Sequence, residues 1–473
     1  MTLDEVPWTS LFAAGETAWV VGLVVFIVLE RRPAASSLAW IFGLVLLPFL
    51  GLPLYFLFGP RRLRRRKLRY RDRRVAVTHA LASSEERMPT AYATRLAGIG
   101  ERLQHTHVST ATRVELFYEG DDAYDAILAA IDRARDHVHV EYYIFEADEV
   151  GAKLRDALTA AATRGVEVRL LVDAVGSLGA GRSFFEDLTR SGGLVRRFQP
   201  PRLGLSRARF LNFRTHRKIV VVDGCVGFTG GVNWAACHSA RASGASAWRD
   251  THVELEGPVV ASLQRTFVEN WVYSEGDSPT TRRYFPELVG GAELVQILRS
   301  GPDRDVFPIH AFYFSAIATA RERVLLTTPY LVPDEPALAA LKSAVLRGVR
   351  VEILVPREGD SKIVQAASRS YYEELLDAGC ILHEYEGRML HAKTLVIDSE
   401  VATIGTANFD NRSFRLNFEV MAVVYGARHA DALAAQFARD VENAQLVGRR
   451  KLRELGALQR LAEASARLAS PLL

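Results

Sequence analysis

Two apolar stretches stand near the start of the chain. Residues 38–58 are 21 consecutive uncharged, mostly apolar residues, and a helix of that length spans about 31 Å, close to the thickness of a bilayer's hydrocarbon core. A shorter stretch, residues 19–29, reaches spanning length only when extended back to about residue 9, which includes Glu16. The pattern predicts a transmembrane helical hairpin. A cleaved signal peptide is not expected, because the N-terminus MTLDEVPWTS is acidic where a signal needs basic residues.

Beyond residue 120 the same order of helical and strand-like periodicity occurs twice. The first copy contains AAIDRARDHVHVEYYIFEAD (129–148) and RGVEVRLLVD (164–173), and the second contains SAIATARERVLLTTPYLVPD (315–334) and RGVRVEILVP (347–356). Helical segments alternating with short strands rich in Val, Ile and Leu are typical of an α/β fold with a mainly parallel or mixed sheet covered on both faces. We therefore expect a duplicated α/β unit.

These patterns divide the chain into five parts. They are a transmembrane hairpin (1–60), a basic segment and connector (61–110), two similar α/β halves (111–280 and 281–440) and a C-terminal amphipathic helix (441–473). Leucines follow helical spacing among arginines in residues 449–468. We expect this last helix to pack on the protein, with membrane contact as the alternative.

The net charge of +4 conceals one strongly basic segment. Residues 61–74 hold ten Lys and Arg and one acid, so the rest of the chain carries −5. The positive-inside rule then places the two halves on the cytoplasmic side of the membrane, and the run can attract anionic headgroups; a solvated charge run is the alternative. The acidic remainder argues against nucleic acid as a partner. Three cysteines, Cys225, Cys237 and Cys380, support neither a disulfide framework nor a zinc site.

Each half contains a histidine and a lysine two residues apart, followed five residues later by an aspartate. The residues are His216, Lys218 and Asp223 in THRKIVVVDG, and His391, Lys393 and Asp398 in LHAKTLVIDS. The chain has only seven lysines against 52 arginines. Two of these lysines stand two residues after the motif histidines, which chance explains poorly. In a strand, residues two apart share a face, so each imidazole emerges beside its ammonium group. Each aspartate falls at a hairpin turn, which favours a structural role for it.

A turn of small residues ending in asparagine follows each hairpin. The candidates are Gly231 and Asn233 in the first half, and Thr406 and Asn408 in the second. Glycine lets backbone N–H groups approach an anion, asparagine adds a neutral donor, and lysine suits a phosphate oxygen. Both halves together therefore predict one phosphate site at a pseudo-twofold axis.

A carboxylate recurs after each turn, Asp250 in WRDTHV and Glu419 in RLNFEV. We expect each to lie beside the histidine of its own half and to fix the tautomer by accepting the Nδ1 proton. An ordinary surface carboxylate is the alternative.

Other candidates are weaker. His137, His139 and Glu141 alternate on one strand as metal ligands can, but the second half has no counterpart, which favours a strand face. Five other histidines have no partner motif and are interpreted as structural, namely His105, His107, His238, His310 and His383. Cys237 is not expected to be a catalytic thiol.

The paired motifs, the glycine turns and the asparagines resemble the phospholipase D superfamily over roughly residues 110–440. More narrowly, NFRTHRKIVVVDG, WRDTHVELEGP, TPYLVPD, MLHAKTLVID and GTANFDNRSFRLNFE, together with the N-terminal apolar stretches, are similar to bacterial cardiolipin synthases. Thr406 stands where many relatives carry serine. In that superfamily His216, Lys218, Asp223, His391, Lys393 and Asp398 match the catalytic signature.

The resemblance implies two similar α/β halves that share one active site and transfer a phosphatidyl group by double displacement. One histidine forms a phosphohistidine, and the other protonates the leaving alcohol and later deprotonates the acceptor. By analogy His216 is the nucleophile and His391 the acid/base. Two phosphatidylglycerol molecules would give cardiolipin and glycerol at a membrane bilayer. Neither a metal nor another cofactor is expected, because the lysines and asparagines neutralise the phosphate.

Three alternatives remain at this stage. A hydrolytic phospholipase D, releasing phosphatidic acid, would use the same residues and differ only in its product. A phosphodiesterase acting on nucleic acid shares the motifs but fits the acidic remainder poorly. A non-catalytic lipid-binding scaffold fits poorly as well, because all six motif positions are intact.

Overall fold

The computed structural model describes residues 8–29, 34–46, 90–199, 213–274, 276–303, 306–450 and 456–473. The basic run at 61–74, and residues 47–58 of the expected second span, lie outside this part of the chain. Contacts divide the chain into two compact units, Met1–Arg61 with Pro201–Asn212, and Arg62–Pro200 with Phe213–Leu473. Each unit is described by itself.

The smaller unit is built around two helices, α1 (Trp8–Leu29) and α2 (Ala34–Leu46). They pack together through Ile27 and Leu44, which are buried. Within the described residues, no helix has both the length and the apolar character needed to cross a bilayer. The expected transmembrane hairpin is therefore not supported.

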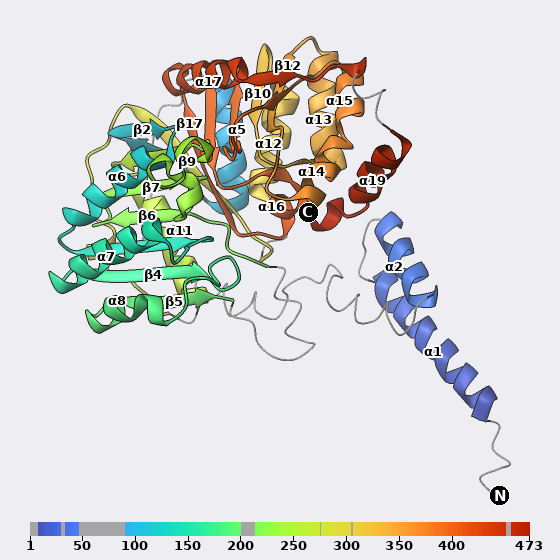
Figure 1. Cartoon of the computed structure of the whole chain (residues 1–473), viewed down its shortest axis with the longest axis horizontal. Helices are drawn as coiled ribbons and strands as arrows, with labels where there is room; N and C mark the ends of the chain where they lie inside the picture. Colours follow the sequence, from blue (N-terminus) through green and yellow to red (C-terminus); the bar gives the residue numbers. More distant parts are fainter. Residues whose placement is uncertain are drawn as a thin grey trace, which may run out of the picture. The chain divides into compact units, whose positions relative to one another are not determined.

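The first half of the larger unit is a seven-stranded mixed sheet in the order β2-β8-β7-β6-β3-β4-β5 (Figure 1). Its strands are β2 (Arg113–Phe117), β3 (His137–Tyr142), β4 (Glu167–Asp173), β5 (Leu194–Phe198), β6 (Ile219–Val222), β7 (Val226–Gly230) and β8 (His252–Glu256). Strands β3, β4 and β5 are parallel, and the other neighbours pair antiparallel.

The second half repeats this arrangement. Its nine-stranded sheet has the order β1-β9-β17-β15-β14-β10-β12-β13-β18, in which the seven strands from β9 to β13 correspond one by one to the first sheet. Its strands are β1 (Ser109–Ala111), β9 (Glu293–Ser300), β10 (Arg323–Thr327), β12 (Arg350–Pro356), β13 (Ile381–Tyr385), β14 (Thr394–Ile397), β15 (Val401–Gly405), β17 (Glu419–Tyr425) and β18 (Ala444–Leu446). Strands β11 (Leu331–Val332) and β16 (Phe409–Asp410) pair separately. The duplicated α/β unit expected from the sequence is present.

Helices cover both sheets. Those of the first half are α6 (Gly120–Asp132), α7 (Glu149–Thr163), α8 (Glu186–Arg190), α10 (Ala240–Ser243) and α11 (Val260–Tyr273). Those of the second half are α12 (Pro308–Thr319), α13 (Glu335–Leu346), α14 (Lys362–Arg369), α15 (Tyr372–Ala378), α16 (Asn411–Arg415), α17 (Ala427–Glu442) and α19 (Ala457–Arg467). The weakly patterned connector forms α5 (Ala91–Gln104), whose Tyr92 and Leu96 join the core of the second half, while β1 pairs with β9.

Alternate residues of each central strand face different cores. In β6, Val220 and Val222 pack with α6 and α7, whereas Ile219 and Val221 face a core that also contains apolar residues of β9, β15 and β17. This second core is shared by both sheets and includes α11 and α17. The two halves are thus held together by apolar packing.

Candidate active site

A short ladder between the halves positions His216. Thr215 bridges Phe418, and the backbone N–H of His216 donates to the carbonyl of Phe418 (2.9 Å). The N–H of Phe418 in turn donates to the carbonyl of Arg214 (2.9 Å). The residue after Phe418 is Glu419, so this ladder brings the histidine of the first half against the carboxylate of the second.

The same ladder recurs around His391. Arg249 bridges Leu390, the N–H of His391 donates to the carbonyl of Arg249 (2.7 Å), and the N–H of Arg249 donates to the carbonyl of Met389 (2.9 Å). Asp250 follows Arg249 directly. The two ladders are related by the internal duplication, as a pseudo-twofold axis through the site requires.

Each histidine consequently binds the carboxylate of the other half. His216 Nδ1 lies 3.1 Å from both oxygens of Glu419, and His391 Nδ1 lies 2.6 Å from Asp250 Oδ2. All four side chains are buried. The expected pairing within one half is wrong. The ladders place the residue before each carboxylate beside the residue before the histidine of the other half. The orienting contact itself is present, since each Nδ1–H donates to a carboxylate and leaves Nε2 with a lone pair.

Two buried lysines supply positive charge at the centre of the site. The ammonium of Lys218 donates to the carbonyl of His216 (2.9 Å), and that of Lys393 donates to the carbonyl of His391. Burial and the charge of Lys393 lower the pKa of Lys218 to about 7. Burial lowers the pKa of Lys393 to about 8, although Asp250 and Glu419 act against it. An anion beside these groups would favour their charged forms.

Burial also keeps both histidines neutral near pH 7. It lowers the pKa of His216 to about 4, against the attraction of Glu419. For His391, burial and the charges of Lys393 and Lys218 hold the pKa well below its ordinary value. A neutral imidazole with Nδ1–H bound to a carboxylate is suited to nucleophilic attack or proton acceptance through Nε2.

The motif aspartates lie at the turns of the hairpins, at the end away from the histidines. Asp223 and Asp398 both have positive φ (53° and 54°). The carboxylate of Asp223 accepts the backbone N–H groups of residues 135, 136 and 137 at 2.8 to 2.9 Å, and that of Asp398 accepts those of residues 321, 322 and 323. These contacts fix the chain entering β3 and β10, which agrees with the structural role inferred from the turn positions.

Residues of the two small-residue turns contact the carboxylates of Asp250 and Glu419. A side chain at Gly231 would clash with Asp250, and the hydroxyl of Thr406 donates to Glu419. The backbone N–H groups of Gly231 and Thr406 both donate within the sheet, to the carbonyls of Thr251 and Val420. Direct phosphate binding by these two residues therefore has no geometric support, and their observed contacts hold the histidine partners instead.

The two asparagines are buried beside the site. Asn233 Nδ2 lies 3.4 Å from His238 Nε2, and Asn408 Nδ2 donates to Asp410 (3.2 Å). Among the described residues, the side-chain oxygen of each has no hydrogen-bond partner. Their place at the ends of neighbouring strands is the one expected, and phosphate binding by them stays a prediction.

The alternating residues of β3 engage separate partners. His139 Nδ1 lies 2.9 Å from Gln264 Nε2, His137 Nδ1 contacts Asp136 (2.7 Å), and Glu141 accepts hydrogen bonds from Thr215 and Asn270. This is the strand face expected. Glu141 also supports the residue that precedes His216, a role that its alternating pattern did not indicate.

The residues assigned no chemistry fall into two groups. His310 contacts Asp334 (3.0 Å) and His383 contacts Glu352 (3.0 Å). Burial raises the pKa of Cys237 to about 12, which keeps its thiol protonated. His238, by contrast, lies in the site: its Nδ1 is 3.6 Å from Asp250 Oδ2, and its ring centroid is 5.3 Å from that of His391. A lone histidine without a repeated motif gave no sequence signal for this position.

Aromatic side chains flank both histidines and were also missed. The Tyr143 ring is 5.1 Å from that of His216, and the Trp248 ring is 5.0 Å from that of His391. Their apolar faces contribute to the burial that shifts the imidazole pKa values.

One cluster has the spacing of a metal site. Ligand atoms of His238, Asp250 and His391 lie within 4.8 Å of one another, and all three residues are buried. The ammonium groups of Lys218 and Lys393 act electrostatically on both histidines and oppose protonation. The same charges would oppose a divalent cation, so we assign the cluster to proton handling.

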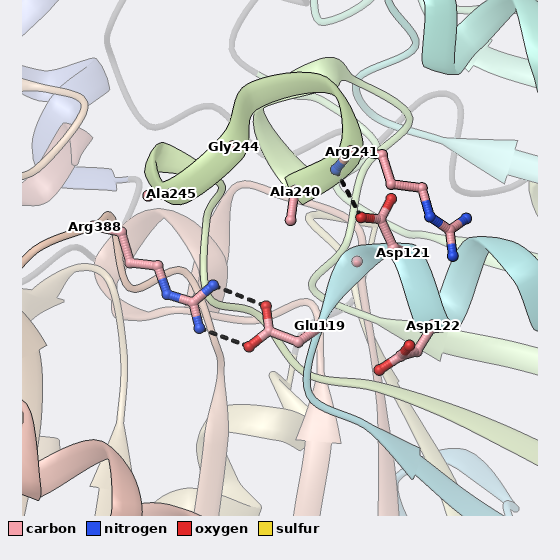
Figure 2. A pocket seen from close by; sticks show the side chains of 9 residues that line it. Glu119, Asp121, Asp122, Ala240, Arg241, Gly244, Ala245 and Arg388 are labelled. Atoms are coloured by element: carbon pink, nitrogen blue, oxygen red, sulfur yellow. Dashed lines mark hydrogen bonds and ion pairs between the residues drawn. The ribbon is translucent and has the colours of Figure 1, made fainter.

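A pocket lies at the start of α6, lined there by Glu119 and Asp121 and across from them by Arg388 (Figure 2). Arg388 of the loop that leads to His391 forms a bidentate ion pair with Glu119 (2.6 and 2.8 Å), while the backbone N–H of Arg241 donates to Asp121 (3.0 Å). The Glu119–Arg388 pair joins the two halves three residues before His391. The pocket contains none of the motif residues, so we interpret this pair as a clamp on the His391 loop.

Comparisons with known proteins agree with this geometry. Residues 127–271 and 313–441, one stretch in each half, match the family described as "Cardiolipin synthase, PLD-like domain". The chain belongs to this phospholipase D-like family. Residues 17–60 match the family described as "Phospholipase_D-nuclease N-terminal". The resemblance inferred from the paired motifs is thereby confirmed.

Relatives match almost the whole chain. A cardiolipin synthase of Geobacillus kaustophilus (strain HTA426) is 38% identical over 98% of this chain and 94% of the relative. Cardiolipin synthase 2 of Bacillus anthracis is 36% identical over 97% of this chain and 90% of the relative. The crystal structure of phosphatidylserine synthase from Haemophilus influenzae Rd KW20 aligns with a TM-score of 0.62 at 13% identity, covering 80% of this chain and all of that one. This last likeness shows the fold alone.

Proposed function

We propose that the protein is a cardiolipin synthase that transfers a phosphatidyl group from one phosphatidylglycerol molecule to another, giving cardiolipin and glycerol. The observation that carries the proposal is the buried pair of histidines, each held through Nδ1 by a carboxylate of the other half. Family membership over both halves supports the same class of reaction. Hydrolysis to phosphatidic acid is not favoured, because full-length relatives carry the synthase name.

The first displacement uses one histidine as nucleophile. Nε2 of His216 attacks phosphorus, the bond from phosphorus to the glycerol oxygen breaks, and the leaving oxygen takes a proton from Nε2 of His391. Glu419 holds the Nδ1 proton of His216 and stabilises the positive charge that the ring gains. The product is a phosphatidyl-histidine and free glycerol.

The second displacement reverses these roles with a new alcohol. The hydroxyl of a second phosphatidylglycerol gives its proton to His391 and attacks phosphorus, and the bond to His216 Nε2 breaks. Because both imidazoles are neutral near pH 7 in the free enzyme, the first step needs one added proton. A phosphodiester anion beside them raises their pKa, so one proton binds together with the substrate.

Two ammonium groups provide the electrostatic stabilisation of the reacting phosphate. Lys218 and Lys393 are both buried, and buried cations stabilise developing negative charge more strongly than exposed ones. We propose that Asn233 and Asn408 donate to the same phosphate. On this account the chain needs no metal ion, and excess chelator should leave the rate unchanged.

We also propose that the catalytic halves work at the surface of a bacterial membrane. The leucines of α19 and of its C-cap support this, because Leu458, Leu461 and the C-cap Leu468 are 84%, 65% and 83% exposed. At 100° per residue these positions share one helix face. The opposite face meets the protein, with Glu463 buried and Arg467 paired with Glu374 (2.9 Å). The helix is shorter than the expected 441–473 and packs on the protein through this face, while its leucines point outward.

The position of this helix links it to the active site. The backbone N–H of Arg412 in α16 donates to the carbonyl of Leu473 (2.8 Å), and α16 begins three residues after Asn408. Residues 449–468 carry six Lys and Arg and two acids, a charge that complements anionic phosphatidylglycerol. We therefore propose that this leucine face contacts the bilayer.

The exchange of glycerol tests the proposed reaction. The two phosphodiesters are nearly equal in energy, so cardiolipin with excess deuterated glycerol should give deuterated phosphatidylglycerol. His216→Ala should abolish the exchange, since no phosphohistidine can form. Conversion of cardiolipin to phosphatidic acid without deuterium in phosphatidylglycerol would reject the transferase assignment.

A further inference from the structure

His238 occupies a place in the site that has no equivalent histidine in the second half. It ends a 3-10 turn, Ala236–His238, and is only 1% exposed. Its ring packs against those of Trp248 (5.1 Å) and His391 (5.3 Å). Among the described residues its Nδ1 has no hydrogen-bond partner, and this atom points at Asp250 Oδ2 across 3.6 Å.

The internal duplication shows what is different about this position. Glu419 receives the hydroxyl of Thr406 and the amide of Asn417 (3.2 Å). The residues equivalent to these in the first half are Gly231 and Trp248, neither of which donates a hydrogen bond to Asp250. The residue that corresponds to His238 in the second half is Ser413, which accepts from the N–H of Asn408 (3.1 Å). Asp250 therefore lacks the two side-chain donors that Glu419 has, and His238 stands beside it.

The charges around His238 define the form in which it acts. Asp250, His391, Lys393 and Lys218 are the charged or titratable groups that act on it, and burial outweighs Asp250 to hold the His238 pKa well below its ordinary value. From α6, Gly120 packs on the backbone carbonyl of His238 without adding charge. A neutral ring here offers Asp250 an N–H donor, and its partner at Nε2 is Asn233.

We propose that His238 is a positioning residue for His391, acting through Asp250. When His391 gains a proton, a small closure of the 3.6 Å gap lets Nδ1–H of His238 donate to Asp250. That hydrogen bond stabilises the carboxylate charge and weakens its pull on the His391 proton. The imidazolium can then release its proton to the leaving glycerol. The inference rests on the proposed reaction and makes His391, rather than His216, the acid/base.

A pair of substitutions separates this role from simple packing. His238→Phe keeps the ring and removes the donor, whereas His238→Gln keeps an N–H donor. We expect His238→Phe to lower kcat about tenfold or more with little change in KM, and to move the limb of the pH profile that reports His391 upward. His238→Gln should recover most of the rate. His429→Gln, at a buried histidine next to Glu293, is the matched control and should leave both quantities unchanged.

The readout is released glycerol, measured on protein whose thermal unfolding matches the wild type. Transfer and hydrolysis both release glycerol, so the role of His238 is tested even if the product is phosphatidic acid. An unshifted pH profile in His238→Phe would overturn the proposal. A kcat of His238→Gln as low as that of His238→Phe would also overturn it, because restoring an N–H donor would then restore no activity. If His238→Phe does not fold, His238→Leu, which also lacks the donor, replaces it with the same expected shift and the same criterion.

Discussion

At the scale of single residues, the crossed pairs of histidine and carboxylate are the feature on which the chemistry depends. His216 depends on Glu419 and His391 on Asp250, so neither half holds a complete catalytic unit. A buried carboxylate fixes the imidazole tautomer and stabilises the imidazolium. Removing its charge should leave the packing intact and the tautomer undefined.

We therefore expect Glu419→Gln and Asp250→Asn each to lower kcat by roughly 10²- to 10⁴-fold, with a smaller effect on KM. Nitrogen-15 NMR of the histidine rings identifies the partner. Glu419→Gln should perturb the signals of His216, and Asp250→Asn those of His391. The reverse assignment would contradict the crossed geometry.

The pH dependence follows from the lysines and from His216. The pKa of Lys218 is about 7 and that of Lys393 about 8, both below the ordinary lysine value, so the free enzyme loses positive charge as the pH rises through this window. Binding of the phosphodiester anion weakens accordingly, and kcat/KM should fall there. On the acid side the pKa of His216 is about 4, so its neutral form persists well below pH 6.5. A kcat/KM that does not fall between pH 7 and 9, or an acid limb near 6.5, would refute this assignment.

At the scale of secondary-structure elements, the two hairpins act as anchors as well as supports for the motifs. The turn between β6 and β7 places Asp223 over three backbone N–H groups at the start of β3. Asp223→Asn replaces one acceptor oxygen by a donor that faces donors, which should cost about 1–3 kcal/mol of unfolding free energy. Asp132→Asn, at an exposed carboxylate on α6, should cost almost nothing.

Thermal unfolding and the initial rate of the folded protein measure the two effects separately. The expected result for Asp223→Asn is a lower melting temperature with the rate per folded molecule largely kept. An unchanged melting temperature together with complete inactivity would make the aspartate catalytic.

Sequence-based expectations were accurate where a feature depends on residues close in sequence, and they failed where it depends on contacts between distant segments. Local rules located the repeated strands, the hairpin turns and the aspartates in them, because these depend on neighbours within a few residues. The partner of Glu419 could not be predicted locally, since it depends on how Phe418 pairs with the segment before His216. His238 was missed for the same reason. Only the folded chain brings it to Asp250.

At the scale of the whole molecule, the outward leucines of α19 connect the site to its lipid substrate. A leucine side chain moved from water to hydrocarbon gains about 1.5–3 kcal/mol, so three of them can hold the catalytic unit at a surface. The triple change of Leu458, Leu461 and Leu468 to Ser should lower turnover at limiting vesicle lipid by about tenfold or more. Turnover of monomeric short-chain phosphatidylglycerol should be unchanged.

The control is a change of Leu346 and Val289 to Ser, two residues that are 83% and 84% exposed elsewhere. It should behave as the wild type with both substrates. Equal rates of the triple variant and the control on vesicles would show that the leucine face does not meet the bilayer. A loss on monomeric lipid as well would place its effect in the fold.

Transfer in preference to hydrolysis is the central claim, and the products from phosphatidylglycerol as sole lipid test it most directly. Water at ~55 M outcompetes any alcohol unless the phosphohistidine is screened and a second lipid is offered at high effective concentration. The full-length protein with phosphatidylglycerol vesicles should give cardiolipin and glycerol in equal amounts, with little phosphatidic acid, when the products are quantified by mass spectrometry. Phosphatidic acid in an amount equal to the released glycerol, without cardiolipin, would contradict the account.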